Sequence, residues 1–150
     1  MFIHKKVRLN ASITQSMRFF LIDKEVAKWL GDSTIESKKG GRFMLNLEFE
    51  DKTWVSDTIL LEKVFERLIK FDMITAEANL PSSVEINFMP CTSKTEYCTE
   101  IHLVHRHTKD EQDFMSRFWD EKFDKLRKYF NSDWIIEDRD LVLSDLKGGF

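Results

Sequence analysis

Three histidines, His102, His105 and His107, are the first residues whose type and spacing suggest chemistry. Imidazole is the commonest neutral ligand for zinc and related metals. On an extended strand, however, His105 and His107 share one face while His102 points to the other, so the three cannot converge on one ion without a bulge. We therefore expect no metal site. His105, in register with Ile101 and Leu103, is the histidine expected to turn inward.

Carboxylates are plentiful, but most of them have an ordinary structural explanation. Asp110-Glu111-Asp113 suits the start of a helix, and Glu137-Asp138-Asp140 suits a solvated tail. Asp57 is different, because it sits among apolar strand positions and would need a partner such as His105 or Arg42 inside a cavity. If the chain is an enzyme, His105 and Asp57 are the expected acid and base.

Other catalytic and binding motifs are missing from the sequence. No serine lies in a Gly-x-Ser-x-Gly elbow, and Gly40-Gly41 precedes a strand instead of the helix that a dinucleotide site requires. Cys91 and Cys98 flank a predicted hairpin loop, and we expect them to be reduced, unpaired thiols of a cytosolic protein. The chain is therefore expected to be a binding protein without a metal or cofactor, and not an enzyme.

Composition limits the classes of partner. With 42% hydrophobic and 33% charged residues, a chain of 150 residues can bury one sizeable core. A net charge of -3 gives no positive field that would attract nucleic acid. No apolar run approaches the roughly 18 residues of a membrane span, and the first residues lack the apolar segment of a secretory signal. These features predict a cytoplasmic protein that neither crosses a membrane nor binds nucleic acid.

The elements that would position these residues follow from hydrophobic periodicity. A first strand is followed by two short helices, several alternating strands and one long helix with a broad apolar stripe. The tail beyond this helix contains the apolar runs Trp134-Ile135-Ile136 and Leu141-Val142-Leu143. In order, the expected strands and helices are 2–10, 13–30 (two helices), 43–50, 53–62, 67–73, 84–88, 99–105 and 110–130.

The aromatic residues admit two interpretations. Thirteen phenylalanines against two tyrosines supply apolar bulk without hydroxyl groups that need partners. Inward aromatic side chains either fill the core or form the walls of a ligand chamber, and packing is the default. The set in question is Trp29, Phe43, Trp54, Phe71, Phe88, Phe118 and Trp119.

Five blocks of sequence resemble a known family in their composition and order. They are Val26-Ala27-Lys28-Trp29-Leu30-Gly31, Gly40-Gly41-Arg42-Phe43, Glu66-Arg67-Leu68-Ile69, Val84-Glu85-Ile86-Asn87-Phe88 and Thr99-Glu100-Ile101-His102-Leu103-Val104-His105. Over residues 3–130 the chain is similar to the family named after the activator of heat-shock protein 90 ATPase, in the SRPBCC or START-like superfamily. The resemblance implies an α+β helix-grip fold, in which a curved antiparallel sheet wraps around a long C-terminal helix.

The resemblance also implies a function. We expect a domain at 1–131, with a C-terminal extension at 132–150, that holds a small hydrophobic or amphipathic molecule between the sheet and the long helix. One alternative is a protein-interaction or co-chaperone-like module that forms a homodimer or binds a partner through 132–150. Another is a cyclase, aromatase or hydrolase-like enzyme. The expected ligand-binding residues are Trp29, Phe43, Leu45, Asp57, Phe71, Phe88, Ile101, His105, Phe118 and Trp119.

Overall fold

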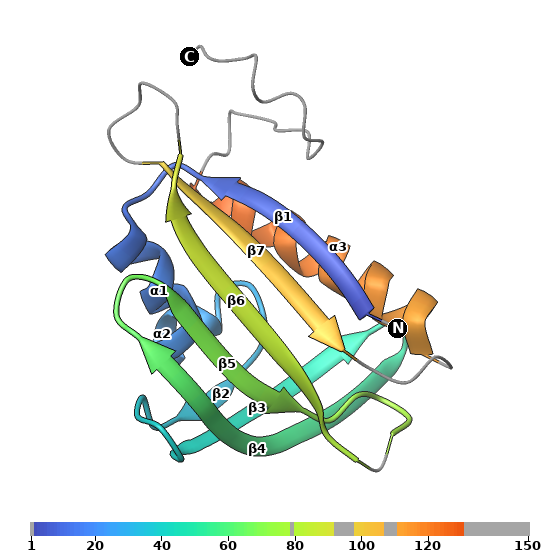
Figure 1. The fold of residues 1–150 in the computed structure, drawn as a ribbon. Helices are drawn as coiled ribbons and strands as arrows, with labels where there is room; N and C mark the ends of the chain where they lie inside the picture. The colour runs from blue at the N-terminus through green and yellow to red at the C-terminus, as the bar shows by residue number, and fades with distance from the viewer. Residues whose placement is uncertain (1, 79, 92–97, 107–110, 131–150) are drawn as a thin grey trace.

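The computed structural model describes residues 2–78, 80–91, 98–106 and 111–130. It shows a seven-stranded antiparallel sheet in the order β1-β7-β6-β5-β4-β3-β2, with the helices on one face (Figure 1). The elements are β1 (Phe2–Leu9), α1 (Ile13–Leu21), α2 (Asp23–Val26), β2 (Ser33–Ile35), β3 (Arg42–Phe49), β4 (Lys52–Val64), β5 (Leu68–Met73), β6 (Ser82–Pro90), β7 (Thr99–Arg106) and α3 (Gln112–Phe130). The predicted helix-grip fold, with a curved sheet around a long C-terminal helix, is confirmed.

The sheet and α3 bury their apolar faces against each other. Along β7 the inward positions are Ile101, Leu103 and His105, and all three are fully buried. The stripe of α3 includes Phe118, Trp119 and other apolar residues that are equally inaccessible. Every second residue of the strands points inward, and these side chains pack against the apolar stripe that recurs every 3.6 residues along the helix.

The two short helices form for local reasons. Ser12 caps α1, because its Oγ accepts a hydrogen bond from the main-chain N–H of Gln15 at 3.1 Å. Asp23, at the start of α2, does not cap the helix with its side chain, because its carboxylate accepts bonds from Ile35 N at 2.9 Å and Ser33 Oγ at 3.0 Å. It therefore ties the start of α2 to β2.

β2 is the one strand of the described chain that the sequence analysis did not predict. It has only three residues, Ser33–Ile35, and pairs with β3 from Leu45 to Phe43. Three residues are too few to show an alternating pattern, although Thr34 and Ile35 are both β-branched. Beyond Leu45, none of the described strands lies beside the outer edge of β3.

The expectation that the two cysteines are free thiols is wrong in this structure. Cys91 and Cys98 form a disulfide with their Cα atoms 5.3 Å apart. The register of β6 and β7 explains the pairing, because Pro90 lies opposite Thr99 and the next pair along is the two cysteines. Antiparallel geometry brings the thiols together, which the argument from cellular compartment could not reveal.

Some predictions fall on parts of the chain that are not described. The extension at 132–150, its two apolar runs, His107 and the acidic cluster at 137–140 lie outside the described residues, as does Asp110. Among the described helices, none combines the length and the continuous apolar character that crossing a bilayer requires.

Candidate functional site

The residues predicted to line an interior cavity lie mainly in the packed core. Nine of the ten are at most 4% exposed, and all nine belong to the face between the sheet and the helices. Their contacts are close: Phe43 and Phe71 stack with ring centroids 4.1 Å apart. The nine are Trp29, Phe43, Leu45, Phe71, Phe88, Ile101, His105, Phe118 and Trp119.

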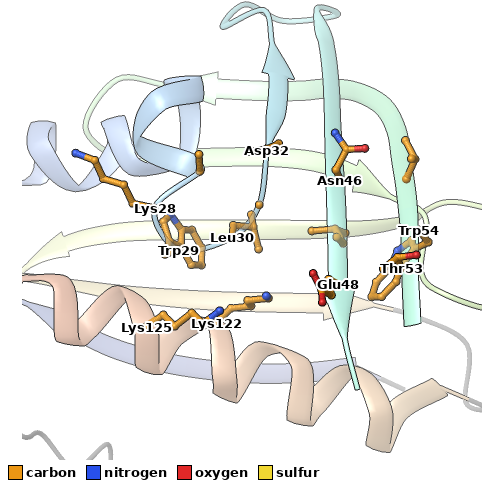
Figure 2. A pocket seen from close by; sticks show the side chains of 14 residues that line it. Lys28, Trp29, Leu30, Asp32, Asn46, Glu48, Thr53, Trp54, Lys122 and Lys125 are labelled. Carbon is orange, nitrogen blue, oxygen red and sulfur yellow. The ribbon is translucent and has the colours of Figure 1, made fainter. Parts of the chain in front are cut away.

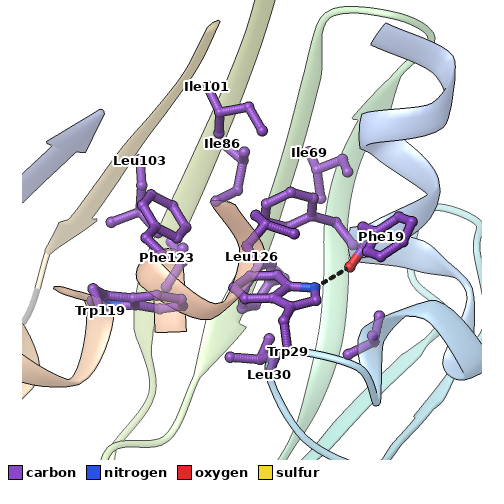
Figure 3. Close-up of a cluster of buried hydrophobic side chains, with 14 of the residues drawn as sticks. Phe19, Trp29, Leu30, Ile69, Ile86, Ile101, Leu103, Trp119, Phe123 and Leu126 are labelled. Carbon is purple, nitrogen blue, oxygen red and sulfur yellow. Dashed lines mark hydrogen bonds between the residues drawn. The ribbon is translucent and has the colours of Figure 1, made fainter. Parts of the chain in front are cut away.

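Trp29 shows how tightly this core is built. Its ring meets Phe20 and Phe123 at centroid distances of 5.0 and 6.0 Å, and its Nε1–H donates to the carbonyl oxygen of Phe19 at 2.7 Å (Figure 3). The large ring is therefore buried with its polar group satisfied. Core packing, the first of the two interpretations of the aromatic set, describes most of its members.

His105 turns inward as predicted and is fully buried. Trp119 Nε1–H donates to its Nδ1 at 3.0 Å, and its Nε2 lies 2.9 Å from Ser82 Oγ. Because an indole N–H can only donate, Nδ1 must accept, and the ring proton is assigned to Nε2. This neutral imidazole links β7 to α3 and β6, because each of its ring nitrogens forms a hydrogen bond to a neighbouring element.

Asp57 does not face the interior. It lies on the outer face of β4 with its side chain 48% exposed, and Arg42 on β3 donates to it from Nε and Nη2 at 3.0 Å each. The hydrogen bond from Arg42 lowers the pKa of Asp57. Arg42 was one of the two expected partners. The other, His105, is on the opposite face with β5 and β6 between, so the expected acid–base pair is wrong.

The histidines do not assemble a metal site within the described residues. His102 points to the other face from His105, as predicted, and its Nε2 lies 2.9 Å from a carboxylate oxygen of Glu100. Its ring also lies beside that of His4, with centroids 5.6 Å apart.

A cleft of about 580 Å³ opens beside the core, at the free edge of β3. It lies between the chain that leaves α2, the neighbouring strands β3 and β4, and the side of α3 (Figure 2). We call it the edge cleft. Its lining residues are Ala27, Lys28, Trp29, Leu30, Gly31, Asp32, Asn46, Leu47, Glu48, Thr53, Trp54, Val55, Lys122 and Lys125.

The sequence shapes one wall of the edge cleft through a close approach of two main chains. Gly31 has a φ of +152°, and a Cβ built there would lie 2.2 Å from the carbonyl oxygen of Asn46. Asn46 N in turn donates to the carbonyl oxygen of Asp32 at 2.8 Å. Only glycine allows this approach, and the chain turns here from the end of α2 into β2.

Apolar and charged groups share the lining of the edge cleft. Trp29, Leu30 and Leu47 are buried members of the core whose outer surfaces border the cleft. Trp54 is partly buried, and its Nε1–H donates to the carbonyl oxygen of Ile74 at 2.9 Å. Half of the fourteen lining residues are polar or charged, so the edge cleft combines an apolar inner wall with charged groups that could orient an amphipathic guest.

Lys122 is the functional candidate that sequence reasoning missed. It lies in the second half of α3 among other cationic residues, where lysines normally face water, yet its side chain is only 6% exposed. Burial lowers the pKa of Lys122, and the charge of Lys125 adds to this effect. The signal was present, because Phe118, Lys122 and Leu126 follow one another at intervals of four on the apolar stripe.

A second hollow of about 530 Å³ lies between β1, the end of β3 and α3. Its charged groups already have partners: Lys5 pairs with Asp120 at 2.8 Å, and Arg117 pairs with Glu50 at 2.9 Å. A polar surface whose charges are mutually paired offers less to a guest molecule than the edge cleft does.

Comparison with known proteins places the chain in a family. The family model described as "Activator of Hsp90 ATPase homolog 1-like protein" matches residues 10–131. The chain belongs to this family. The predicted resemblance is thereby confirmed. The fold described above is the START-like, SRPBCC-type fold of this family. A comparison with curated protein sequences finds no match at the threshold applied.

Solved structures agree with the family fold. A protein of Mesorhizobium loti, MLL2253, is 15% identical with a TM-score of 0.71, and the match covers 90% of this chain and 100% of that one. CalU16 from Micromonospora echinospora is 17% identical with a TM-score of 0.69, covering 89% and 76%. The Aha1 dimer from Colwellia psychrerythraea is 14% identical with a TM-score of 0.68, covering 87% and 96%. At these identities the likeness concerns the fold.

Proposed function

We propose that this START-like domain binds a small hydrophobic or amphipathic molecule in the edge cleft. The observation that supports the proposal is a cleft of about 580 Å³ next to the core, bordered by Trp29, Leu30, Leu47 and Trp54. This volume lies within the range of about 300–1,000 Å³ that is typical of small-molecule sites. Burial of an apolar guest there would contribute about 25 cal/mol per Å².

The site differs in place from the one expected from the sequence. Most of the expected residues fill the core, and a polar substitution at a fully buried position such as Phe118 would test folding instead of binding. A useful variant has to change the cleft and spare the core. Ala27 suits this purpose, because it lines the edge cleft and is exposed.

The test is a titration with 1-decanol, followed by the fluorescence of the tryptophans that border the cleft. Wild-type protein should show saturable binding, and Ala27→Phe should weaken it at least ten-fold because the larger ring occupies the cleft. Thermal unfolding of the variant checks that the core is intact. Native mass spectrometry of protein purified without detergent should also show a retained small molecule in the wild type. Absence of saturable binding in the wild type would refute the proposal.

A second candidate function is protein interaction. It is favoured by the likeness to an Aha1 protein that is described as a dimer. The same native mass spectra test it, because a homodimer has twice the monomer mass. A monomer at every concentration up to about 100 μM would argue against self-association of useful strength, since a Kd of that order corresponds to only about −5.5 kcal/mol.

A further inference from the structure

Lys122 places a buried ammonium group in the wall of the edge cleft. It extends from α3 toward the cleft (Figure 2), and its Nζ lies 5.5 Å from the centroid of the Phe118 ring. Among the described residues, the one carboxylate within 4.0 Å of the ammonium is that of Glu121, at 3.6 Å. This distance exceeds the 2.7–3.2 Å of a good N–H···O bond. Glu121 itself is 46% exposed.

A buried charge without a close acceptor is energetically unfavourable. An ammonium has three donors and no acceptor, and removing it from water costs free energy unless hydrogen bonds or an opposite charge compensate. The half-exposed Glu121 at 3.6 Å, together with the charge of Glu48, supplies only part of that compensation. An anionic group that entered the edge cleft would supply the rest.

The free edge of β3 adds a second donor to the same cleft. Asn46 N donates to Asp32 O, so the main-chain groups of residue 46 point away from β4. In an antiparallel strand the direction repeats every two residues, so the N–H of Glu48 points the same way. Within the part of the chain that the structure describes, no strand pairs with Glu48 on this side. The cleft therefore presents a main-chain N–H in addition to the lysine.

The charges around the cleft also limit the charge of the guest. Two carboxylates, Asp32 and Glu48, line it together with three lysines, Lys28, Lys122 and Lys125. Lys28 is already paired with Glu25 at 2.8 Å. Two carboxylates in the lining disfavour a dianion such as a phosphate monoester, whereas a single carboxylate matches a single buried ammonium.

We propose that the guest of the edge cleft is an amphipathic monocarboxylate, which binds with its carboxylate on Lys122 and its apolar tail along Trp29, Leu30 and Trp54. This inference rests on the proposed function and specifies the chemical class of the ligand. The carboxylate gives the binding its orientation, and the apolar tail gives it most of its free energy.

Paired probes test the inference: decanoate and 1-decanol, which have the same chain length and differ in charge. Both are titrated against wild type, Lys122→Met and the control Lys128→Met, with tryptophan fluorescence as the readout. Lys128 is a 67% exposed lysine of the same helix that does not line the edge cleft. Lys122→Met should weaken decanoate binding about ten-fold or more, because a hydrogen bond to a charged group contributes about 1.5–3 kcal/mol. The affinity of Lys122→Met for 1-decanol should stay within about three-fold of the wild-type value, and Lys128→Met should bind both probes within the same range.

The outcomes separate the two proposals. If 1-decanol binds but decanoate binds no more weakly to Lys122→Met than to wild type, the assignment of the carboxylate is overturned and the hydrophobic site stands. If neither probe binds to the wild type, the proposed function fails and the inference fails with it. Lys122→Gln, which keeps the length of the side chain almost unchanged, serves as the second neutral variant. Circular dichroism shows that each variant is folded.

Discussion

Replacing Lys122 by methionine should make the ligand-free protein more stable. The side chain is 6% exposed, and burial lowers its pKa, so the folded state disfavours the charged form. Exchanging buried charges for apolar groups of similar volume often stabilises by about 1–4 kcal/mol. The lost attraction to the half-exposed Glu121, 3.6 Å away, offsets at most about 1 kcal/mol of this. We expect a net gain of about 1–2 kcal/mol near neutral pH.

The gain in stability can be measured as a rise in Tm, and the size of that rise should depend on pH. For a chain of this size, 1 kcal/mol corresponds to about 2–4 °C, so the expected rise is about 2–8 °C. Burial holds the pKa of Lys122 in the folded state below its ordinary value of 10.5. The cost of its charge is therefore fully present below the folded pKa and disappears as the pH rises toward the unfolded value. The difference in Tm between Lys122→Met and the wild type should therefore narrow as the pH rises from the folded pKa of Lys122 to its unfolded pKa.

Lys125 provides the control for this stability measurement. Lys125 is exposed and lines the same cleft, so Lys125→Met should change the stability by no more than about 0.5 kcal/mol. A lower Tm for Lys122→Met, or a gain that is the same at every pH, would show that the ammonium is well solvated or well paired. The reasoning about its burial would then be wrong.

Three further predictions concern the scaffold. Gly31→Ala should lower the free energy of unfolding in urea by more than about 2 kcal/mol, because its Cβ would lie 2.2 Å from a carbonyl oxygen of β3; an unchanged midpoint would mean that the chain moves aside freely. Trp119→Phe replaces the indole by a smaller phenyl ring and removes the N–H donor to His105 Nδ1, and the cavity and the lost bond together should lower Tm by the equivalent of about 1–3 kcal/mol; equal stability would show that neither the bond nor the tight packing of this ring contributes. Replacing Cys91 and Cys98 by serine should cost about 2.5 kcal/mol for so short a loop, and a reductant should lower the Tm of the wild type alone; a wild type insensitive to reductant would contradict the pairing.

Much of the fold could be predicted because its signals are long and periodic. The strand from Arg42 to Phe49 alternates over eight residues, and the helix from Gln112 to Phe130 repeats its apolar stripe over five turns. The three residues of β2 carry no such signal, and their place depends on the carboxylate of Asp23, twelve positions before Ile35. Contacts of this kind appear only when the chain is folded.

The candidate site was harder to predict than the fold, for a physical reason. Alternation shows which side chains point inward, but it does not show whether they meet or leave a space. Phe43 and Phe71 point inward and stack on each other, so they fill the space that they were expected to line. Asp57 was misplaced and Lys122 was overlooked, because the chemical type of each residue was given more weight than its position in the periodic pattern. The cytoplasmic location stays a prediction.

The short length of β2 determines how a guest would exchange with solvent. Because the edge cleft lies at the margin of the sheet, a molecule can enter and leave while the long helix and the strands keep all their mutual contacts. Exchange would then be limited by diffusion and by the affinity of the guest, with no opening of the fold. A β2 lengthened at its start by two residues would cover the free edge of β3 and seal the entrance.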